Sequence, residues 1–281
     1  MKRSITIYSL DRAFRNESMD VRGFLNFSAE AGVEAVDVGY YWKDESEELL
    51  LLPNWAKEYN LQLGAYICRN DFNSSDPADI AFQCGLIEHA IDNAALLGIK
   101  FVRIFITWFL FDQTYWDIKS WLIPVLKNLV AYAQQENVIL VIENHGYIGN
   151  ASVELLDILN EVGSDHLRIL LDIGNFLLVG ENPLDGIRAL APFTVHVHIK
   201  DFRIVAESDS EDALTTKDGR IIVPTIVGQG DLDLEGSLTI LHQSGCAGYL
   251  SIECEAPGDA RANTIASLHA LDRTLKKLGL R

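Results

Sequence analysis

The chain has 281 residues, and its 40 acidic and 23 basic side chains give a formal net charge of −17. This length accommodates one large domain or two ordinary ones, and a composition of 48% hydrophobic and 22% charged residues is typical of a folded globular protein. The acidic balance disfavours binding to nucleic acid and to anionic membrane surfaces.

The N-terminus and the cysteines favour a cytoplasmic protein. The apolar stretch after Met1-Lys2-Arg3 is too short for a signal peptide, and no apolar run of about 18 residues predicts a membrane span. The cysteines form no C-x-x-C pair, so we expect reduced thiols at Cys68, Cys84, Cys246 and Cys254.

Short runs rich in β-branched residues alternate with longer segments of helical periodicity along the chain. The pattern predicts strands at 4–10, 35–40, 62–68, 100–107, 138–144, 167–173, 194–200 and 249–255. It predicts helices at 19–32, 45–59, 77–98, 118–136, 151–163, 183–191, 232–244 and 260–278. Eight such units of about 35 residues fit a closed (β/α)₈ barrel. We therefore predict an α/β protein with a single TIM-barrel domain over residues 1–281. An open, doubly wound sheet is less favoured, because no glycine-rich turn follows the first predicted strand.

The connection between the seventh and eighth predicted strands is unusually long. Its segment 202–231 contains Asp218-Gly219, a turn signal that makes a small hairpin plausible. Connections of this kind lie on the barrel face where active sites are built. We expect a rim or lid over that face; a solvated excursion or a subunit contact is the alternative.

The last four predicted strands end in polar residues that a buried strand does not ordinarily carry. Because side chains alternate along a strand, these residues share the face that points into the barrel. The pattern predicts that four of them converge at the mouth: Glu143, Asp172, His198 and Glu253. A lone acidic residue at a strand end is often a cap or an ion-pair partner, but four in successive units favour a site.

Three carboxylates close together would repel one another, and a divalent cation removes that repulsion. Oxygen ligands with one imidazole suit Mn²⁺, Mg²⁺, Co²⁺ or Zn²⁺. We therefore predict one bound divalent metal ion at the barrel mouth.

At these residues the chain resembles the sugar phosphate isomerase/epimerase superfamily, the xylose isomerase-like barrels. The matching segments occur in family order: V-I-E-N-H-G (141–146), L-L-D-I-G-N (170–175), H-V-H-I-K-D (196–201), G-Q-G-D-L-D (228–233) and L-S-I-E-C-E (250–255). The resemblance implies that the four residues bind one metal, commonly Mn²⁺, and that Glu143 and Glu253 form the catalytic acid/base pair. Asn175 stands where some ketose epimerases have a sugar-contacting histidine, a departure that weighs against a ketose 3-epimerase.

These residues support proton abstraction next to a carbonyl, with the metal stabilising the enediolate. We expect an isomerase or epimerase acting on a sugar, polyol ketone or small hydroxy-keto substrate. Loss of a β-hydroxyl from the same intermediate gives a lyase, such as an inosose-type dehydratase, and the sequence leaves this alternative open. An endonuclease-like phosphodiesterase and a non-catalytic binding barrel are less favoured. A homo-oligomer is compatible with the sequence.

Several further residues are candidate substrate contacts. Arg103 lies on the inner face of the fourth predicted strand, where it either pairs with Asp37 or orients a substrate oxygen. Tyr66 is expected to line the pocket, and His145 to bind a substrate hydroxyl or support the metal ligands. Lys200 and Asp201 cap the seventh predicted strand near the metal, and the resemblance adds Asn175 as a sugar contact.

Three other features have weaker or structural interpretations. Lys200 could alternatively form an ion pair with Glu255, and His196 is expected to be a buried core residue. The aromatic segment 107–116 is predicted to form a pocket wall, a subunit contact or both.

Overall fold

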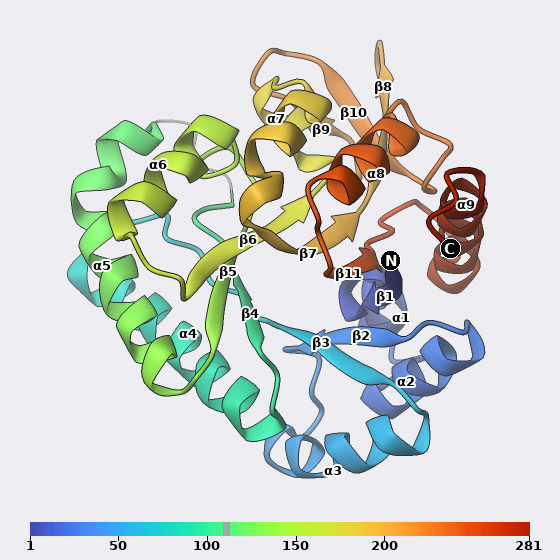
Figure 1. The fold of residues 1–281 in the computed structure, drawn as a ribbon, viewed down its shortest axis with the longest axis horizontal. Coiled ribbons are helices and arrows are strands. Elements are labelled where there is room, and N and C mark those ends of the chain that lie inside the picture. Colours follow the sequence, from blue (N-terminus) through green and yellow to red (C-terminus); the bar gives the residue numbers. More distant parts are fainter. Residues whose placement is uncertain (109–112) are drawn as a thin grey trace.

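A closed barrel of parallel strands forms the centre of the protein (Figure 1). The computed structural model describes residues 1–108 and 113–281. In this part, the barrel strands are β1 (Lys2–Thr6), β2 (Ala35–Gly39), β3 (Gln62–Ile67), β4 (Phe101–Ile104), β5 (Ile139–Glu143), β6 (Leu167–Asp172), β7 (Thr194–Ile199) and β11 (Tyr249–Ile252). Strand β1 pairs in parallel with both β2 and β11, and this pairing closes the barrel. The predicted α/β barrel is confirmed.

Helices surround the barrel (Figure 1). They are α2 (Val21–Glu30), α3 (Glu45–Glu58), α4 (Pro77–Leu97), α5 (Tyr115–Gln135), α6 (Ser152–Val162), α7 (Pro183–Leu190), α8 (Leu234–Gln243) and α9 (Ala260–Lys277). Outward-facing strand residues such as Val102 and Leu140 belong to the buried apolar cluster that joins strands to helices. Shorter helical segments are η1 (Ile7–Leu10), α1 (Asp11–Arg15), η2 (Asn175–Val179) and η3 (Ala191–Phe193).

Two element boundaries differ from the sequence prediction for identifiable reasons. The first strand ends at Thr6, not at residue 10, because the chain turns into η1. There the Ser9 hydroxyl donates to the Ile252 carbonyl at 2.8 Å and accepts from the Cys254 amide at 3.0 Å. The helix expected to begin at residue 118 begins at Tyr115, because Thr114 and Asp117 form a capping box.

The connection between β7 and β11 carries a small antiparallel sheet. Its strands are β8 (Asp201–Val205), β9 (Leu214–Thr215) and β10 (Ile221–Thr225), in the order β8-β10-β9. The Asp201 carboxylate closes the base of this excursion by accepting from the backbone amides of Gly228 at 2.8 Å and Gly230 at 2.9 Å. At its far end, Asp212 pairs with Arg12 of α1 at 2.8 Å. Asp201 therefore joins the two ends of the excursion, and Asp212 holds it to α1.

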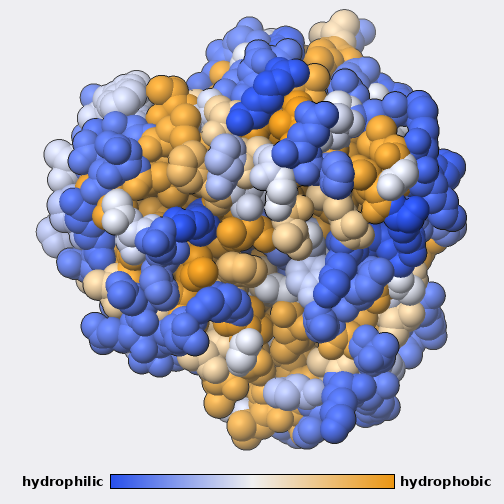
Figure 2. Space-filling view, in the orientation of Figure 1, coloured by the Kyte–Doolittle hydropathy of each residue, from blue (hydrophilic) through white to orange (hydrophobic). Residues whose placement is uncertain are grey.

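The surface is consistent with the strongly acidic composition. On the face shown in Figure 2, hydrophilic residues predominate around the periphery and apolar residues gather nearer the middle. Within the described ranges, no helix has the length and apolar character needed to cross a bilayer.

Candidate metal centre and cavity

Four buried side chains meet at the C-terminal mouth of the barrel. Glu143 and Asp172 end strands β5 and β6, His198 lies in β7, and Glu253 directly follows β11. Each offers a ligand atom, and these atoms all lie within 4.8 Å of one another. The convergence predicted from strand alternation is therefore present in the structure.

The donor atoms of this cluster fit a divalent cation. Asp172 Oδ2 is buried and has no hydrogen-bond partner among the described residues, and Lys200 Nζ lies 3.7 Å from it. The other Asp172 oxygen accepts from the amides of Gly174 at 2.7 Å and Asn175 at 2.9 Å, which fixes the carboxylate. Buried polar atoms without partners are costly, and three carboxylates with one imidazole suit a hard or borderline divalent ion.

In the metal-free protein, bound protons and neighbouring cationic side chains compensate the negative charge of the clustered carboxylates. Burial, together with Glu253 and Glu143, raises the pKa of Asp172 to about 7. Burial opposes protonation of His198, but Glu253 and Glu143 hold its pKa well above the ordinary value. Burial likewise opposes ionisation of Glu253, but Lys200 and His198 hold its pKa well below the ordinary value. Cation binding would thus compete with protons in this cluster.

A cavity of about 200 Å³ opens beside the cluster. Its polar lining consists of Arg103, His145, Asn175, Lys200, Glu253 and Glu255. Its aromatic and aliphatic walls are Tyr8, Tyr40, Phe105, Trp108, Leu178, Phe202 and Leu214. Phe202 and Leu214 come from the excursion, which therefore forms part of the wall. Trp108 belongs to the predicted aromatic segment, of which residues 109–112 lie outside the described residues.

Arg103 lies at the inner end of this cavity. Its Nε is 3.3 Å from Glu143 Oε2, and its guanidinium lies 3.8 Å from the centre of the Phe105 ring. Its Nη1 has no hydrogen-bond partner within the described part of the chain. The alternative pairing of Arg103 with Asp37 is wrong, because Asp37 is bound by His196 and Ser251.

Lys200 bridges the two glutamates at the end of β11. Its Nζ lies 2.7 Å from Glu253 Oε1 and 2.6 Å from Glu255 Oε1, so the ion pair with Glu255 expected from the sequence is present. Burial lowers the pKa of this ammonium, but the carboxylates, Glu253 first, more than offset that effect. Lys200 is therefore a cation at neutral pH.

Two other predicted substrate contacts also line the cavity. Asn175 Nδ2 lies 3.4 Å from Glu143 Oε1. Burial lowers the pKa of His145 to about 4, so this imidazole is neutral at pH 7, and its ring lies 4.3 Å from that of Phe105.

Tyr66 and Asp201 lie outside this cavity. Strand β3 has an extra residue between the pairs Val36–Leu63 and Val38–Tyr66, and such a bulge reverses which face the following side chains occupy. The Tyr66 hydroxyl consequently lies among the helices, 3.1 Å from Asn93 Nδ2 of α4. The Asp201 carboxylate is occupied by the backbone of the excursion. Neither residue is retained as a candidate substrate contact.

Some lining residues were not predicted as site residues. Tyr40 ends the second predicted strand, and that position was a usable signal. Tyr8 was not recognised because the first strand was predicted to continue to residue 10, whereas it ends at Thr6. No sequence pattern identified Phe202 and Leu214, because their role depends on how the excursion folds back over the barrel.

Comparison with known proteins agrees with the barrel fold. A family model described as a xylose isomerase-like TIM barrel matches residues 25–274. The inosose dehydratase of Clostridium botulinum (strain Eklund 17B / Type B) is 30% identical over 148 residues, which cover 52% of this chain and 49% of that protein. The chain thus spans about half the length of the curated relatives it matches first.

Solved structures extend the similarity of fold to nearly the whole chain. The IolI protein with a bound zinc atom has a TM-score of 0.78 at 18% identity, with 99% of each chain covered. A D-tagatose 3-epimerase-like protein has a TM-score of 0.76 at 17% identity, covering 99% of this chain and 98% of the other. At these identities the likeness shows the fold alone.

Proposed function

Because the chain belongs to the xylose isomerase-like TIM barrel family, we propose that it is a metal-dependent enzyme that removes a proton next to the carbonyl of a sugar or polyol ketone. The observation that carries this proposal is the buried cluster of four ligand atoms within 4.8 Å, beside a cavity with polar and aromatic walls. A small-molecule substrate fits such a cavity.

Glu143, Asp172, His198 and Glu253 would hold the ion. A divalent cation supplies positive charge that stabilises the negative charge developing on substrate oxygens. The zinc atom in the IolI structure supports a divalent metal, and Mn²⁺ is the ion that the sequence resemblance suggests, with Mg²⁺, Co²⁺ and Zn²⁺ as alternatives.

Glu253 is the proposed base. It lines the cavity, and the adjacent ammonium of Lys200 and imidazole of His198 keep it ionised. Glu143 is the proposed second acid/base group. It does not line the cavity itself, but it contacts Arg103, which does, at 3.3 Å. The free N–H of Arg103 is positioned to hold a substrate oxygen, as are the side chains of His145 and Asn175.

Water loss from a cyclic polyol ketone is the outcome we favour. Lys200 and Glu255 both line the cavity next to Glu253, so a proton donor for a departing hydroxyl lies beside the base. The inosose dehydratase relatives support the same class of reaction.

Isomerisation or epimerisation is the second candidate. This outcome needs a second base that returns the proton to a different face or carbon, and Glu143 of the ligand cluster is the candidate. In both outcomes the first step is the same.

A proton-exchange screen tests the proposal and separates the outcomes. The protein would be incubated in D₂O with Mn²⁺, Mg²⁺, Co²⁺ or Zn²⁺ and an inosose, a ketose or hydroxypyruvate. The proton NMR spectrum would be recorded after removal of the metal. Dehydration releases water, converts one CHOH carbon into a deuterium-labelled methylene and turns the carbon that lost its proton into a second carbonyl. Isomerisation gives exchange with a new stereoisomer or carbonyl position. If none of these substrates exchanges with any of the four metals, the proposed substrate class is wrong.

A further inference from the structure

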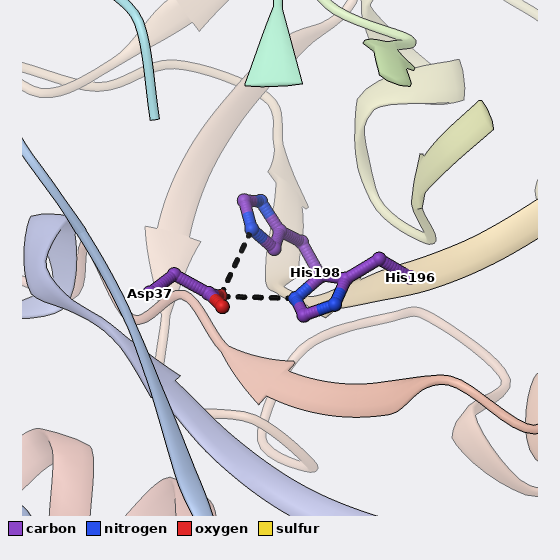
Figure 3. Close-up of side chains that lie close together, drawn as sticks. All are labelled: Asp37, His196 and His198. Atoms are coloured by element: carbon purple, nitrogen blue, oxygen red, sulfur yellow. Dashed lines mark hydrogen bonds and ion pairs between the residues drawn. The ribbon is translucent and has the colours of Figure 1, made fainter. Parts of the chain in front are cut away.

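A second buried polar group shares His198 with the metal cluster, and Figure 3 shows three of its side chains. Asp37 projects from β2, His196 and His198 from β7, and Ser251 from β11. All four side chains are completely buried. None of them lines the cavity that holds Glu253, so direct contact with substrate does not explain this group.

His198 lies between the two groups, and its ring nitrogens face opposite ways. Its Nδ1 is 2.8 Å from Glu253 Oε2 and 3.6 Å from Glu143 Oε1, on the side of the ligand cluster. Its Nε2 is 3.7 Å from Asp37 Oδ2, an ion-pair separation that is longer than a hydrogen bond, and Figure 3 shows the Asp37 carboxylate facing both imidazoles. An imidazole that binds a metal through Nδ1 carries its proton on Nε2, and that N–H needs an acceptor.

Several hydrogen bonds hold the Asp37 carboxylate in place beside His198. Its Oδ1 accepts from the Ala65 amide at 3.0 Å, at the bulge in β3. Its Oδ2 accepts from Ser251 Oγ at 2.5 Å and from His196 Nε2 at 3.0 Å. A Cβ at Gly64 would lie 2.6 Å from Asp37 Oδ1, so the glycine leaves room for the carboxylate.

We propose that Asp37 is the positioning residue of the metal centre: its carboxylate attracts the protonated Nε2 of His198 across 3.7 Å and so holds that ring with Nδ1 toward the ion. The inference rests on the metal binding proposed above. The negative charge of Asp37 also adds to that of the ligand cluster, from the far side of the His198 imidazole. His196 and Ser251 fix the carboxylate and do not contact the ion.

The competing interpretation is a second metal ion held by Asp37, His196 and His198, whose donor atoms are also close enough to share one. The contacts argue against it. His196 Nε2 hydrogen-bonds to the Asp37 carboxylate at 3.0 Å, so this nitrogen carries a proton and offers no lone pair to an ion. An ion there would also compete with the first for His198.

Metal titrations of the Asp37→Asn variant test the proposal, because this change removes the charge and keeps the shape. Mn²⁺ affinity and stoichiometry would be measured from free Mn²⁺ in EPR spectra. We expect the wild-type protein to bind about one equivalent and the variant to bind about 10- to 100-fold more weakly. The matched control is Glu154→Gln, another buried carboxylate, which accepts from the Gly149 amide at 2.7 Å and should leave Mn²⁺ affinity unchanged.

A second measurement on the wild-type protein covers the case in which the variant does not fold. Long-range ¹⁵N–¹H spectra of the zinc-loaded protein report which nitrogen of His198 carries the proton, with the resonance identified by its loss in His198→Gln. We expect a proton on Nε2 and the metal on Nδ1.

The outcomes distinguish the role of Asp37 from the metal binding on which it depends. Three results would each overturn the role of Asp37. The first is equal Mn²⁺ affinity of Asp37→Asn and wild-type protein, and the second is a proton on Nδ1 of zinc-bound His198. The third is a second equivalent of Mn²⁺ that binds the wild-type protein and is lost in Asp37→Asn. A wild-type protein that binds no metal at all would instead overturn the proposed function on which this role rests.

Discussion

At the scale of single residues, strand alternation predicts which side chains face the barrel interior but not how deep they lie. Glu143 and His198 were placed correctly because every second residue of a strand shares a face. Arg103 and Asp37 also face inward, but Arg103 lies beside Glu143 and Asp37 beside His196. Depth depends on the register between strands, which one strand's sequence does not contain.

The two glutamates at the end of β11 provide a matched pair of variants. Glu253→Gln should reduce solvent-deuterium exchange into substrate by at least about 10²-fold, because it removes the proposed base, and it should weaken metal binding as well. Glu255→Gln keeps the ligand cluster intact and should retain metal affinity. The measurement is proton exchange by NMR alongside a Mn²⁺ titration. Unimpaired exchange in Glu253→Gln would exclude its role in proton transfer.

Asp172 should make the stability of the metal-free protein depend on pH. Its pKa rises from the ordinary 3.8 to about 7 in the folded state, so between these values the folded chain holds a proton that the unfolded chain has lost. Unfolding then releases a proton, and the free energy of unfolding falls as pH rises from about 4 to 7. Asp172→Asn should lose this dependence and become more stable relative to wild type as pH increases. Urea unfolding of both proteins at several pH values checks this, and parallel pH profiles would contradict it.

At the scale of elements, regular units were predictable and irregular ones were not. The strand and helix periodicities located the units of the barrel, and the turn signal at Asp218-Gly219 fell between β9 and β10. The bulge in β3 left no comparable signal, and its one-residue shift is the reason that Tyr66 lies among the helices. The position of Phe202 in the cavity wall likewise depends on tertiary folding of the excursion.

The excursion between β7 and β11 should depend on Asp201 at its base. Asp201→Asn replaces an acceptor of several backbone amides with a group that also carries donors, so we expect a loss of about 1–3 kcal/mol in stability. Limited proteolysis should then cut first within residues 206–213. Because Phe202 and Leu214 line the cavity, KM should rise more than kcat falls. Unchanged proteolysis and KM would show that Asp201 does not hold the excursion in place.

At the scale of the whole molecule, closure of the barrel creates the site. The ends of β5, β6, β7 and β11 are consecutive around the barrel, so residues 143, 172, 198 and 253 meet although more than 100 positions separate the first from the last. The ordered motifs at these strand ends also carried the family resemblance, which the match over residues 25–274 confirms. The reaction, the native metal, the cytoplasmic location and any homo-oligomer remain predictions.

Metal binding should stabilise the entire fold, because the four ligands converge only when the barrel is closed. At a concentration 100 times the dissociation constant, an ion that binds only the folded state contributes about 2.7 kcal/mol, which corresponds to roughly 5–10 °C in Tm for a chain of this size. Thermal unfolding with Mn²⁺ and with excess chelator measures this shift. The Asp172→Asn variant should show a smaller one.

The most direct test of the account is the metal content of the purified protein, measured together with its proton-exchange activity before and after treatment with chelator. We predict about one divalent ion per chain, loss of exchange when the ion is removed, and recovery when Mn²⁺ is restored. A protein that contains no metal and still exchanges substrate protons at the full rate would contradict the central claim.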